Sequence, residues 1–202
     1  MRGEGALAWC DISTGELRLT ECPRTRLAAE LARLSPSELL VADEVEPDLR
    51  ELTGEFRIAL TGRPRAAFDS AQGARRLATA LGVATLDGFG TLSRADLAAL
   101  GGLVEYLDLT QRGRMPLLAP PVRESATTAM QIDAATRRNL ELTQALSGGR
   151  EGSLLACIDL TVTAAGARLL ERRLSGPSRD PGAIRARLAA VDHLHADDTL
   201  RS

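Results

Sequence analysis

A run of charged and polar residues between positions 133 and 141 is the part of the sequence best suited to specific chemistry. In MQIDAATRRNLEL (130–142), Asp133 is followed by Arg137, Arg138, Asn139 and Glu141. The planar fork of arginine suits desolvated pairing with carboxylates and carbonyls, and asparagine is a poor residue inside a helix. We therefore interpret these five residues as a polar joint that holds a neighbouring segment, with Asp133 as a helix N-cap.

A simpler interpretation of the same residues is a solvated helix surface. Arg138 and Glu141 are three residues apart, and Arg137 and Glu141 are four apart. Such pairs stabilise a helix by roughly 0.2–0.5 kcal/mol each. The asparagine does not fit this interpretation well, so both interpretations stay open at the level of the residues.

Acidic residues near expected strand ends offer a second kind of chemistry. Asp11 lies on the first expected strand, and Asp43 and Glu44 follow a later one. Carboxylates in such places can hold two Mg²⁺ ions in a nuclease site. However, Asp43 and Glu44 belong to a generally acidic loop, VADEVEPD, and no other carboxylate stands at a matching place. A metal-dependent nuclease is therefore the alternative function, and a Mg²⁺-dependent cleavage assay would test it.

The remaining reactive residue types predict no cofactor or metal site in this chain. His193 and His195 form an isolated H-x-H pair, which predicts a solvated helix end, because no other metal-ligand motif accompanies it. Cys10, Cys22 and Cys157 are scattered and odd in number, which predicts reduced thiols. The sequence contains no lysine, so it lacks the G-x-x-x-x-G-K-[ST] loop that binds ATP phosphates.

Composition predicts a soluble, cytoplasmic protein that binds DNA weakly if at all. No apolar run approaches the roughly 18 residues that a membrane span needs, so no membrane partner is expected. The net charge is −2 and aromatic residues make up 2% of the chain, which disfavours both phosphate binding and base stacking. From residue 123 onward, 11 arginines face 10 acidic residues, so we expect only feeble, nonspecific DNA binding by this piece.

Hydrophobic spacing predicts an α/β arrangement in the first part of the chain. Residues 5–22 predict two strands around the turn Ser13-Thr14-Gly15. Ser93 and Asp96 form a capping-box pattern at the start of a later helix. The other expected elements are helices over 24–34 and 66–82, a helical turn over 46–52, and strands over 38–44 and 55–62.

The segment GRMPLLAPPVRES (113–125) carries three prolines, which disfavour helix and central strand, and we place the domain boundary here, between residues 118 and 119. The second part is expected to be mainly helical after a strand-like TTAMQID (127–133). One helix is predicted from Ser153 to about Leu174, and another starts at Asp180-Pro181. Two long helices cannot enclose an ordinary core, so we expect a truncated chain.

The last expected helix carries an apolar stripe that should form its inner face: Ile184, Leu188, Val191 and Leu194.

Two stretches of this second part resemble the MutS family of bacterial DNA mismatch repair proteins. Ile132–Leu142 and Ser153–Leu170 resemble the start of the family's core domain, whose pattern is I-D-A-A-T-R-R-N-L-E-L followed by S-L-L-x-x-x-D-x-T-x-T-x-x-G-x-R-L-L. One departure is ERRL (171–174), where the family usually carries R-W-L. Upstream, GALAWCDISTGE (5–16) and ARLSPSEL (32–39) resemble the family's connector domain.

The resemblance implies a ribonuclease-H-like connector domain over 1–118 and a partial helical core domain over 119–202. Proteins of this family clamp mismatched double-stranded DNA as dimers, use an N-terminal F-x-E wedge, and bind ATP and Mg²⁺ in a C-terminal domain. None of those motifs occurs in this chain. The resemblance therefore implies a non-enzymatic piece that couples DNA binding to the ATPase and offers a contact surface to MutL.

On this view Asp133, Arg137, Arg138, Asn139 and Glu141 hold the joint between the two domains. The partners implied are the rest of a MutS protein, MutL, and mismatched DNA through the full-length dimer. A free-standing adaptor that binds MutL or MutS without acting on DNA is a further alternative.

Overall fold

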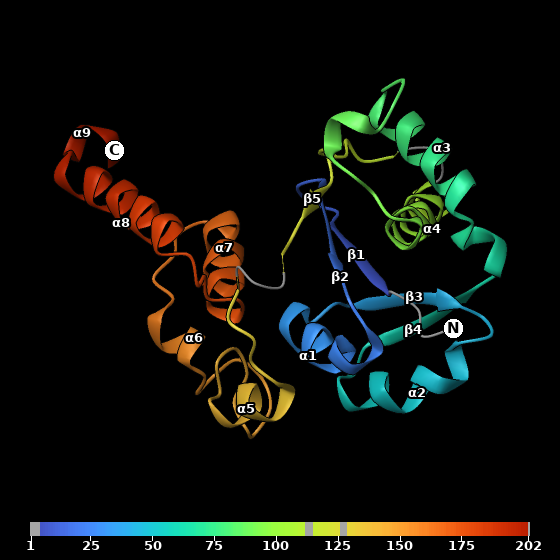
Figure 1. The fold of residues 1–202 in the computed structure, drawn as a ribbon. Helices are drawn as coiled ribbons and strands as arrows, with labels where there is room; N and C mark the ends of the chain where they lie inside the picture. Colours follow the sequence, from blue (N-terminus) through green and yellow to red (C-terminus); the bar gives the residue numbers. More distant parts are fainter. Residues whose placement is uncertain (1–4, 112–114, 126–128, 202) are drawn as a thin grey trace. The chain divides into compact units, whose positions relative to one another are not determined.

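The computed structural model describes residues 5–111, 115–125 and 129–201, and these fall into two compact units (Figure 1). Unit 1 is Met1–Ser125, a mixture of helices and strands, and unit 2 is Ala126–Ser202, which is mainly helical. The fold class is therefore mixed α/β followed by α.

Unit 1 begins with the predicted hairpin. Strands β1 (Ala6–Asp11) and β2 (Glu16–Glu21) pair antiparallel, with Ala6 opposite Glu21 and Asp11 opposite Glu16. The turn needs a left-handed residue, and Gly15 supplies it with φ of 70°. The hairpin prediction is confirmed.

A parallel strand pair follows the hairpin. Helix α1 (Arg24–Leu34) leads to β3 (Glu38–Ala42), helix α2 (Glu46–Glu55) and β4 (Ala59–Arg63). Strands β3 and β4 pair in parallel from Glu38–Ala59 to Ala42–Arg63. One apolar cluster joins α1, β3 and the residue before β4 through three buried side chains: Leu31, Leu39 and Ile58.

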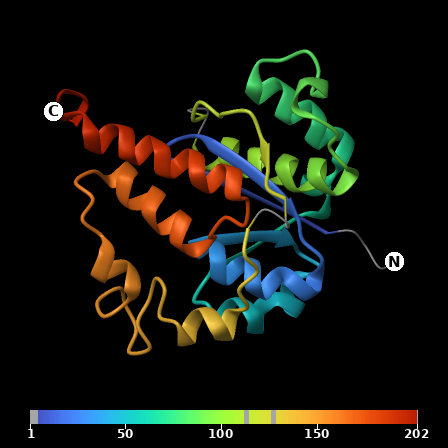
Figure 2. The same cartoon turned by 60° about the vertical axis from the view of Figure 1, so that its left-hand side comes forward.

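Helices α3 (Ser70–Leu81) and α4 (Arg94–Thr110) pack against each other (Figure 2). Short helical turns η1 (Arg65–Phe68) and η2 (Asp87–Phe89) precede them. Gly82 ends α3 in a left-handed conformation, and Ser93 and Asp96 form the predicted capping box. The main core consists of Leu17, Leu19, Leu77, Leu100, Val104, Leu107 and Leu118.

The proline-rich segment after α4 returns to the hairpin and ends unit 1. Strand β5 (Val122–Arg123) pairs in parallel with β2, with Arg18 opposite Val122. Ala119 also donates its N–H to the Gly15 carbonyl at 2.8 Å. These bonds attach residues 119–125 to unit 1, which extends to Ser125.

Unit 2 is built from helices of 4 to 16 residues joined by loops (Figure 1). Its elements are α5 (Ala134–Asn139), α6 (Leu154–Ile158), α7 (Ala164–Ser175), α8 (Pro181–Ala196) and α9 (Asp198–Arg201). The strand predicted over 127–133 is wrong for the residues described there. Ala129 makes only an isolated bridge to Ser178, and residues 127 and 128 lie outside the described part of the chain.

The single helix predicted from Ser153 to Leu174 is also wrong, because it is interrupted between α6 and α7. The Asp159 carboxylate accepts hydrogen bonds from the Thr161 N–H at 2.9 Å and from its hydroxyl at 2.6 Å. Thr163 then caps α7 by accepting from the Gly166 N–H at 3.0 Å. These local side-chain bonds give the backbone an alternative to the helix.

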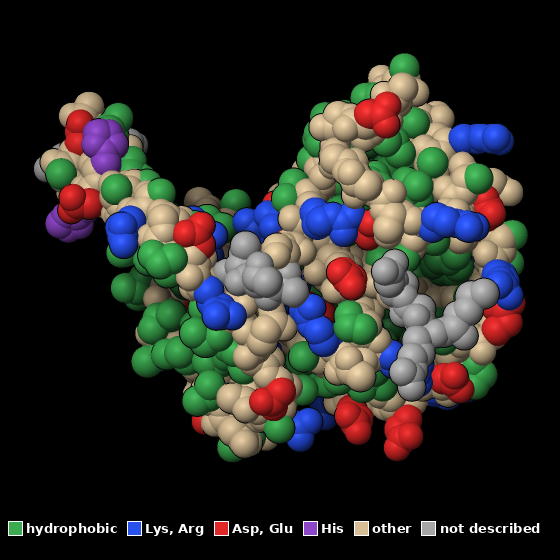
Figure 3. Space-filling model, in the orientation of Figure 1, with side chains coloured by type: hydrophobic (Ala, Val, Ile, Leu, Met, Phe, Trp, Pro, Cys, Tyr) green, Lys and Arg blue, Asp and Glu red, His purple; other side chains and the backbone are tan. Residues whose placement is uncertain are grey.

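The apolar stripe of α8 is exposed, so the prediction that it forms an inner face is wrong for this chain. Leu188 and Val191 are 63% and 58% exposed. In the loop before α7, Leu160 and Val162 are 91% and 98% exposed. Figure 3 shows hydrophobic side chains gathered over the region of α6 and α7.

Among the described residues, no helix combines the length and hydropathy that a membrane crossing requires.

Candidate interdomain joint

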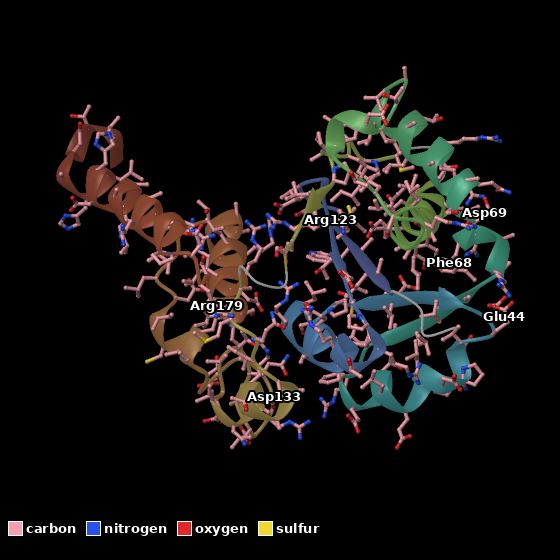
Figure 4. All side chains as sticks on the ribbon, in the orientation of Figure 1. Glu44, Phe68, Asp69, Arg123, Asp133 and Arg179 are labelled. Carbon is pink, nitrogen blue, oxygen red and sulfur yellow. The ribbon has the colours of Figure 1, made fainter. Side chains whose placement is uncertain are left out.

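Asp133 caps α5 as predicted, and Figure 4 labels it beside that helix. Its carboxylate accepts hydrogen bonds from the Thr136 N–H at 2.8 Å and the Thr136 hydroxyl at 2.7 Å. These two hydrogen bonds lower the pKa of Asp133. The side chain therefore fixes the start of α5, and it does so within its own helical turn.

The two adjacent arginines have opposite environments. Arg137 is buried, with 6% of its surface exposed, whereas Arg138 and Asn139 are exposed. A guanidinium is costly to bury unless it is paired and hydrogen-bonded. Of these five residues, Arg137 is therefore the one whose charge costs the most free energy to place.

Glu141 closes the loop that follows α5. Its φ of 47° is left-handed, so the helix does not continue and the helix-surface pairing expected from residue spacing does not form. Its carboxylate accepts from the Leu146 N–H at 2.6 Å, and its carbonyl accepts from the Leu154 N–H at 2.9 Å. Leu142 and Leu155, both buried, add a backbone bond of 2.9 Å beside it.

Three of the five predicted joint residues have a distinct local environment or task. Asp133 caps α5, Glu141 shapes the following loop, and Arg137 is the buried charge between them. Arg138 and Asn139 are exposed at the end of α5.

The carboxylates of the nuclease alternative do not form a metal centre. The Asp11 carboxylate accepts from the Ser13 N–H at 2.9 Å and from the Ser13 hydroxyl at 2.6 Å, within the hairpin turn. Asp43 and Glu44, the latter labelled in Figure 4, lie in the turn after β3. Within residues 5–111, 115–125 and 129–201, no three His, Cys, Asp or Glu side chains group in a way that could hold a metal ion. The nuclease alternative has no support.

The histidines and cysteines lie in positions that require no functional role. His193 and His195 are exposed near the end of α8. Cys10, Cys22 and Cys157 are free cysteines: Cys10 is half-buried, Cys22 is buried and Cys157 is exposed.

One anchor that the sequence did not predict lies at the end of unit 1. Arg123 of β5, labelled in Figure 4, donates to the Asp96 carboxylate at 2.5 Å and to the Thr91 carbonyl at 3.2 Å. Asp96 is 1% exposed. Burial raises the pKa of Asp96, but hydrogen bonds from Arg123 and Ser93 outweigh that effect, so the pKa is lowered. The pair joins residues 27 positions apart, so spacing gave no signal of it.

Comparison with protein families gives a match across both units. The family model for MutS domain II matches residues 2–119, and that for MutS domain III matches residues 135–202. The chain belongs to the MutS family of DNA mismatch repair proteins. In MutS terms, unit 1 matches domain II, the connector domain, and unit 2 matches domain III, the core domain.

Individual MutS relatives are similar along the whole chain. The DNA mismatch repair proteins MutS of Cereibacter sphaeroides and Paracoccus denitrificans are each 63% identical, over 100% and 96% of this chain. That of Roseobacter denitrificans is 56% identical over 95% of the chain. The chain spans 22–23% of the length of these relatives.

Proposed function

We propose that this chain is the part of a MutS protein that couples DNA and mismatch binding to the ATPase, without catalysing a reaction itself. Its partners would be the rest of the MutS protein, MutL, and mismatched double-stranded DNA held by the full-length dimer. ATP and Mg²⁺ would bind elsewhere in that protein. The matches to domains II and III support this proposal, because the chain contains the junction between them.

The burial of Arg137 carries the proposal. The two family matches leave residues 120–134 between them, and Arg137 follows within the first helix of unit 2. A buried charge next to the junction of domains II and III is consistent with a junction that has two conformations. Binding of DNA and binding of ATP could each shift the equilibrium between them.

The test compares two neighbouring arginines in a complete MutS protein. We expect Arg137→Ala to slow ATP-triggered release from mismatched DNA about tenfold, which equals about 1.4 kcal/mol of coupling. Arg138→Ala is the matched control, because it removes the same charge from an exposed side chain, and it should release DNA at close to the wild-type rate. The Arg137→Ala/Arg138→Ala double variant should match the Arg137→Ala single variant.

Wild-type release by Arg137→Ala would refute the role of this residue in coupling. ATP hydrolysis without DNA and the melting temperature should be measured in parallel, because a variant that has simply lost its fold would change both. A selective loss of ATP-triggered release, with both of these preserved, supports the proposal.

The MutL contact is proposed for unit 1. The support is the match of residues 2–119 to MutS domain II, together with the family's use of that domain as a MutL surface. The experiment is competition: this chain, added in excess, should reduce MutL capture by a complete MutS protein on mismatched DNA. Undiminished capture at saturating chain would contradict the proposal.

We also propose that the two sheets of unit 1 are portions of one ribonuclease-H-like sheet. The support is that Leu7 of β1 packs against the apolar cluster of Leu31, Leu39 and Ile58, which includes β3. Amide exchange tests this proposal: protection of β1 amides on the side away from β2 would support it, and rapid exchange there would contradict it.

A further inference from the structure

The carboxylate of Glu124 binds two arginines from different elements of unit 1. Its Oε1 accepts from Arg18 Nη1 of β2 at 2.7 Å, and its Oε2 lies 3.0 Å from Arg33 Nη2 of α1. The side chains of Arg18, Arg33 and Glu124 are only 20%, 13% and 21% exposed. Such partly buried pairs are much less screened by salt than surface pairs.

The backbone of Glu124 is held as firmly as its side chain. Its N–H donates to the Leu19 carbonyl at 2.8 Å, and its carbonyl accepts from the Thr20 hydroxyl at 3.0 Å. Both partners belong to β2, and both are buried. Every polar group of Glu124 is therefore bonded to the body of unit 1.

Apolar burial contributes little after Pro121, which is itself buried. Strand β5 contains two residues, and Val122 is 48% exposed. Two paired residues are fewer than an ordinary strand contains. Polar contacts must therefore supply most of the attachment of the segment that leads out of unit 1.

The two arginines are themselves fixed in orientation. Arg33 Nε donates to Glu30 at 2.8 Å, and its guanidinium lies 5.4 Å from the centre of the Trp9 ring. Glu30 is buried and also accepts from Arg26 at 2.6 Å. Arg18 also pairs with Glu16. A preorganised guanidinium loses less freedom when it forms each hydrogen bond.

We propose that Glu124 is a positioning residue that clamps the end of unit 1, so that the chain leaves unit 1 at a fixed point and in a fixed direction. Its carboxylate is the shared counter-charge of Arg18 and Arg33, so its loss leaves two partly buried cations facing the same space. Burial alone would lower the pKa of Arg18, but hydrogen bonds to Glu16 and Glu124 raise it. For its part in coupling, the inference rests on the proposed function.

The clamp can be tested in this 202-residue chain with Glu124→Gln, which keeps the side-chain shape and removes the charge. We expect the backbone amide of residue 124 to exchange with solvent about tenfold faster, as the loss of one charge-assisted hydrogen bond implies. Amides in the body of β1 and β2 should be unchanged. Glu55→Gln, at an exposed position at the end of α2, is the matched control and should change neither.

A second measurement tests the direction in which the chain leaves unit 1. A change in stability alone would not alter this direction. Spin labels on the exposed Cys157 and on Arg75→Cys, an exposed position in α3, report a distance distribution. Glu124→Gln should broaden this distribution, and Glu55→Gln should not. Arg33→Met should broaden it as well, and combining Arg33→Met with Glu124→Gln should add little further, because both act on one clamp.

Unchanged exchange at residue 124, or an equal acceleration across all amides of unit 1, would overturn the clamp. An unbroadened distance distribution would overturn it too. Failure of the proposed function would look different: Glu124→Gln would show the local opening and the broader distribution, yet a complete MutS protein carrying it would release mismatched DNA on ATP at the wild-type rate.

Discussion

Gly101 of α4 and Gly73 of α3 bring the backbones of their helices into direct contact. A Cβ on Gly101 would lie 2.2 Å from the Cα of Gly73, and a Cβ on Gly73 would lie 2.2 Å from the Leu97 carbonyl oxygen. The neighbouring leucines of the two helices, Leu77 and Leu100, are fully buried in the main core. Glycine at both positions thus sets the helix separation on which the core of unit 1 depends.

Replacing Gly101 with alanine should destabilise unit 1. Gly101→Ala forces α3 and α4 apart, and overpacking of this kind costs about 1–3 kcal/mol. Gly54→Ala is the control, because an added Cβ there meets nothing within 4 Å. Gly54 lies inside α2, so this change should stabilise by about 0.5–1 kcal/mol. Urea unfolding measures both, and equal midpoints for Gly101→Ala and wild type would contradict the contact.

The Arg123–Asp96 pair should make the stability of unit 1 depend on pH. The pKa of Asp96 is lower in the folded chain than its ordinary value of 3.8. Its stabilisation is therefore complete above about pH 5 and is lost as the pH falls through the folded pKa. Arg123→Met should destabilise by about 2 kcal/mol at neutral pH, and the difference from wild type should shrink as Asp96 becomes protonated.

Urea unfolding between pH 3 and pH 7 measures that difference, with Arg94→Met at an exposed position of α4 as the control. A gap between wild type and Arg123→Met that stayed constant over this range would show that Asp96 is not the titrating partner.

Replacement by glycine should change the stability differently at two non-glycine residues that have left-handed conformations. Ser35 (φ 44°) ends α1 and is exposed, so Ser35→Gly should stabilise unit 1 by about 0.5–1 kcal/mol. Glu141 (φ 47°) also bonds the Leu146 N–H. Glu141→Gly loses that bond, worth about 1 kcal/mol, and should give no gain. Thermal unfolding measures both, and an equal gain from the two changes would mean that the Glu141 carboxylate contributes nothing.

The cysteines should react with a thiol reagent at widely different rates. Burial is the main cause that raises the pKa of Cys22 to about 11, so about one molecule in a thousand carries the thiolate at pH 8. Cys157 is exposed. We expect one fast-reacting thiol, removed by Cys157→Ser, and labelling of Cys22 only on unfolding. Rapid labelling of the Cys157→Ser variant in the native state would refute the burial of Cys22.

Local signals in the sequence predicted much of the first unit and several helix ends. Asp133, Ser93 and Gly82 act through bonds to residues within four positions, so their roles as two caps and a helix stop could be foreseen. The same local chemistry explains one failure. The apolar spacing of a helix continues through residues 159–163, but the side chain of Asp159 bonds Thr161 instead and ends α6.

The burial of a side chain, in contrast, could not be predicted from the sequence for neighbouring residues of the same type. Arg137 and Arg138 are identical in type and adjacent, yet one is buried and the other exposed. The α8 stripe has the spacing of a buried face and is exposed. Periodicity shows which side of a helix is apolar, but burial depends on what packs against that side.

The sequence by itself determined the family, through the motif over 132–142 and 153–170, and the local caps and turns that begin and end most elements. Only the tertiary structure decided which charges meet. Arg18 and Glu124 are 106 positions apart, and Arg123 and Asp96 are 27 apart. Local signals need only neighbours along the chain, whereas the pairing of distant charges depends on where β5 returns to the hairpin.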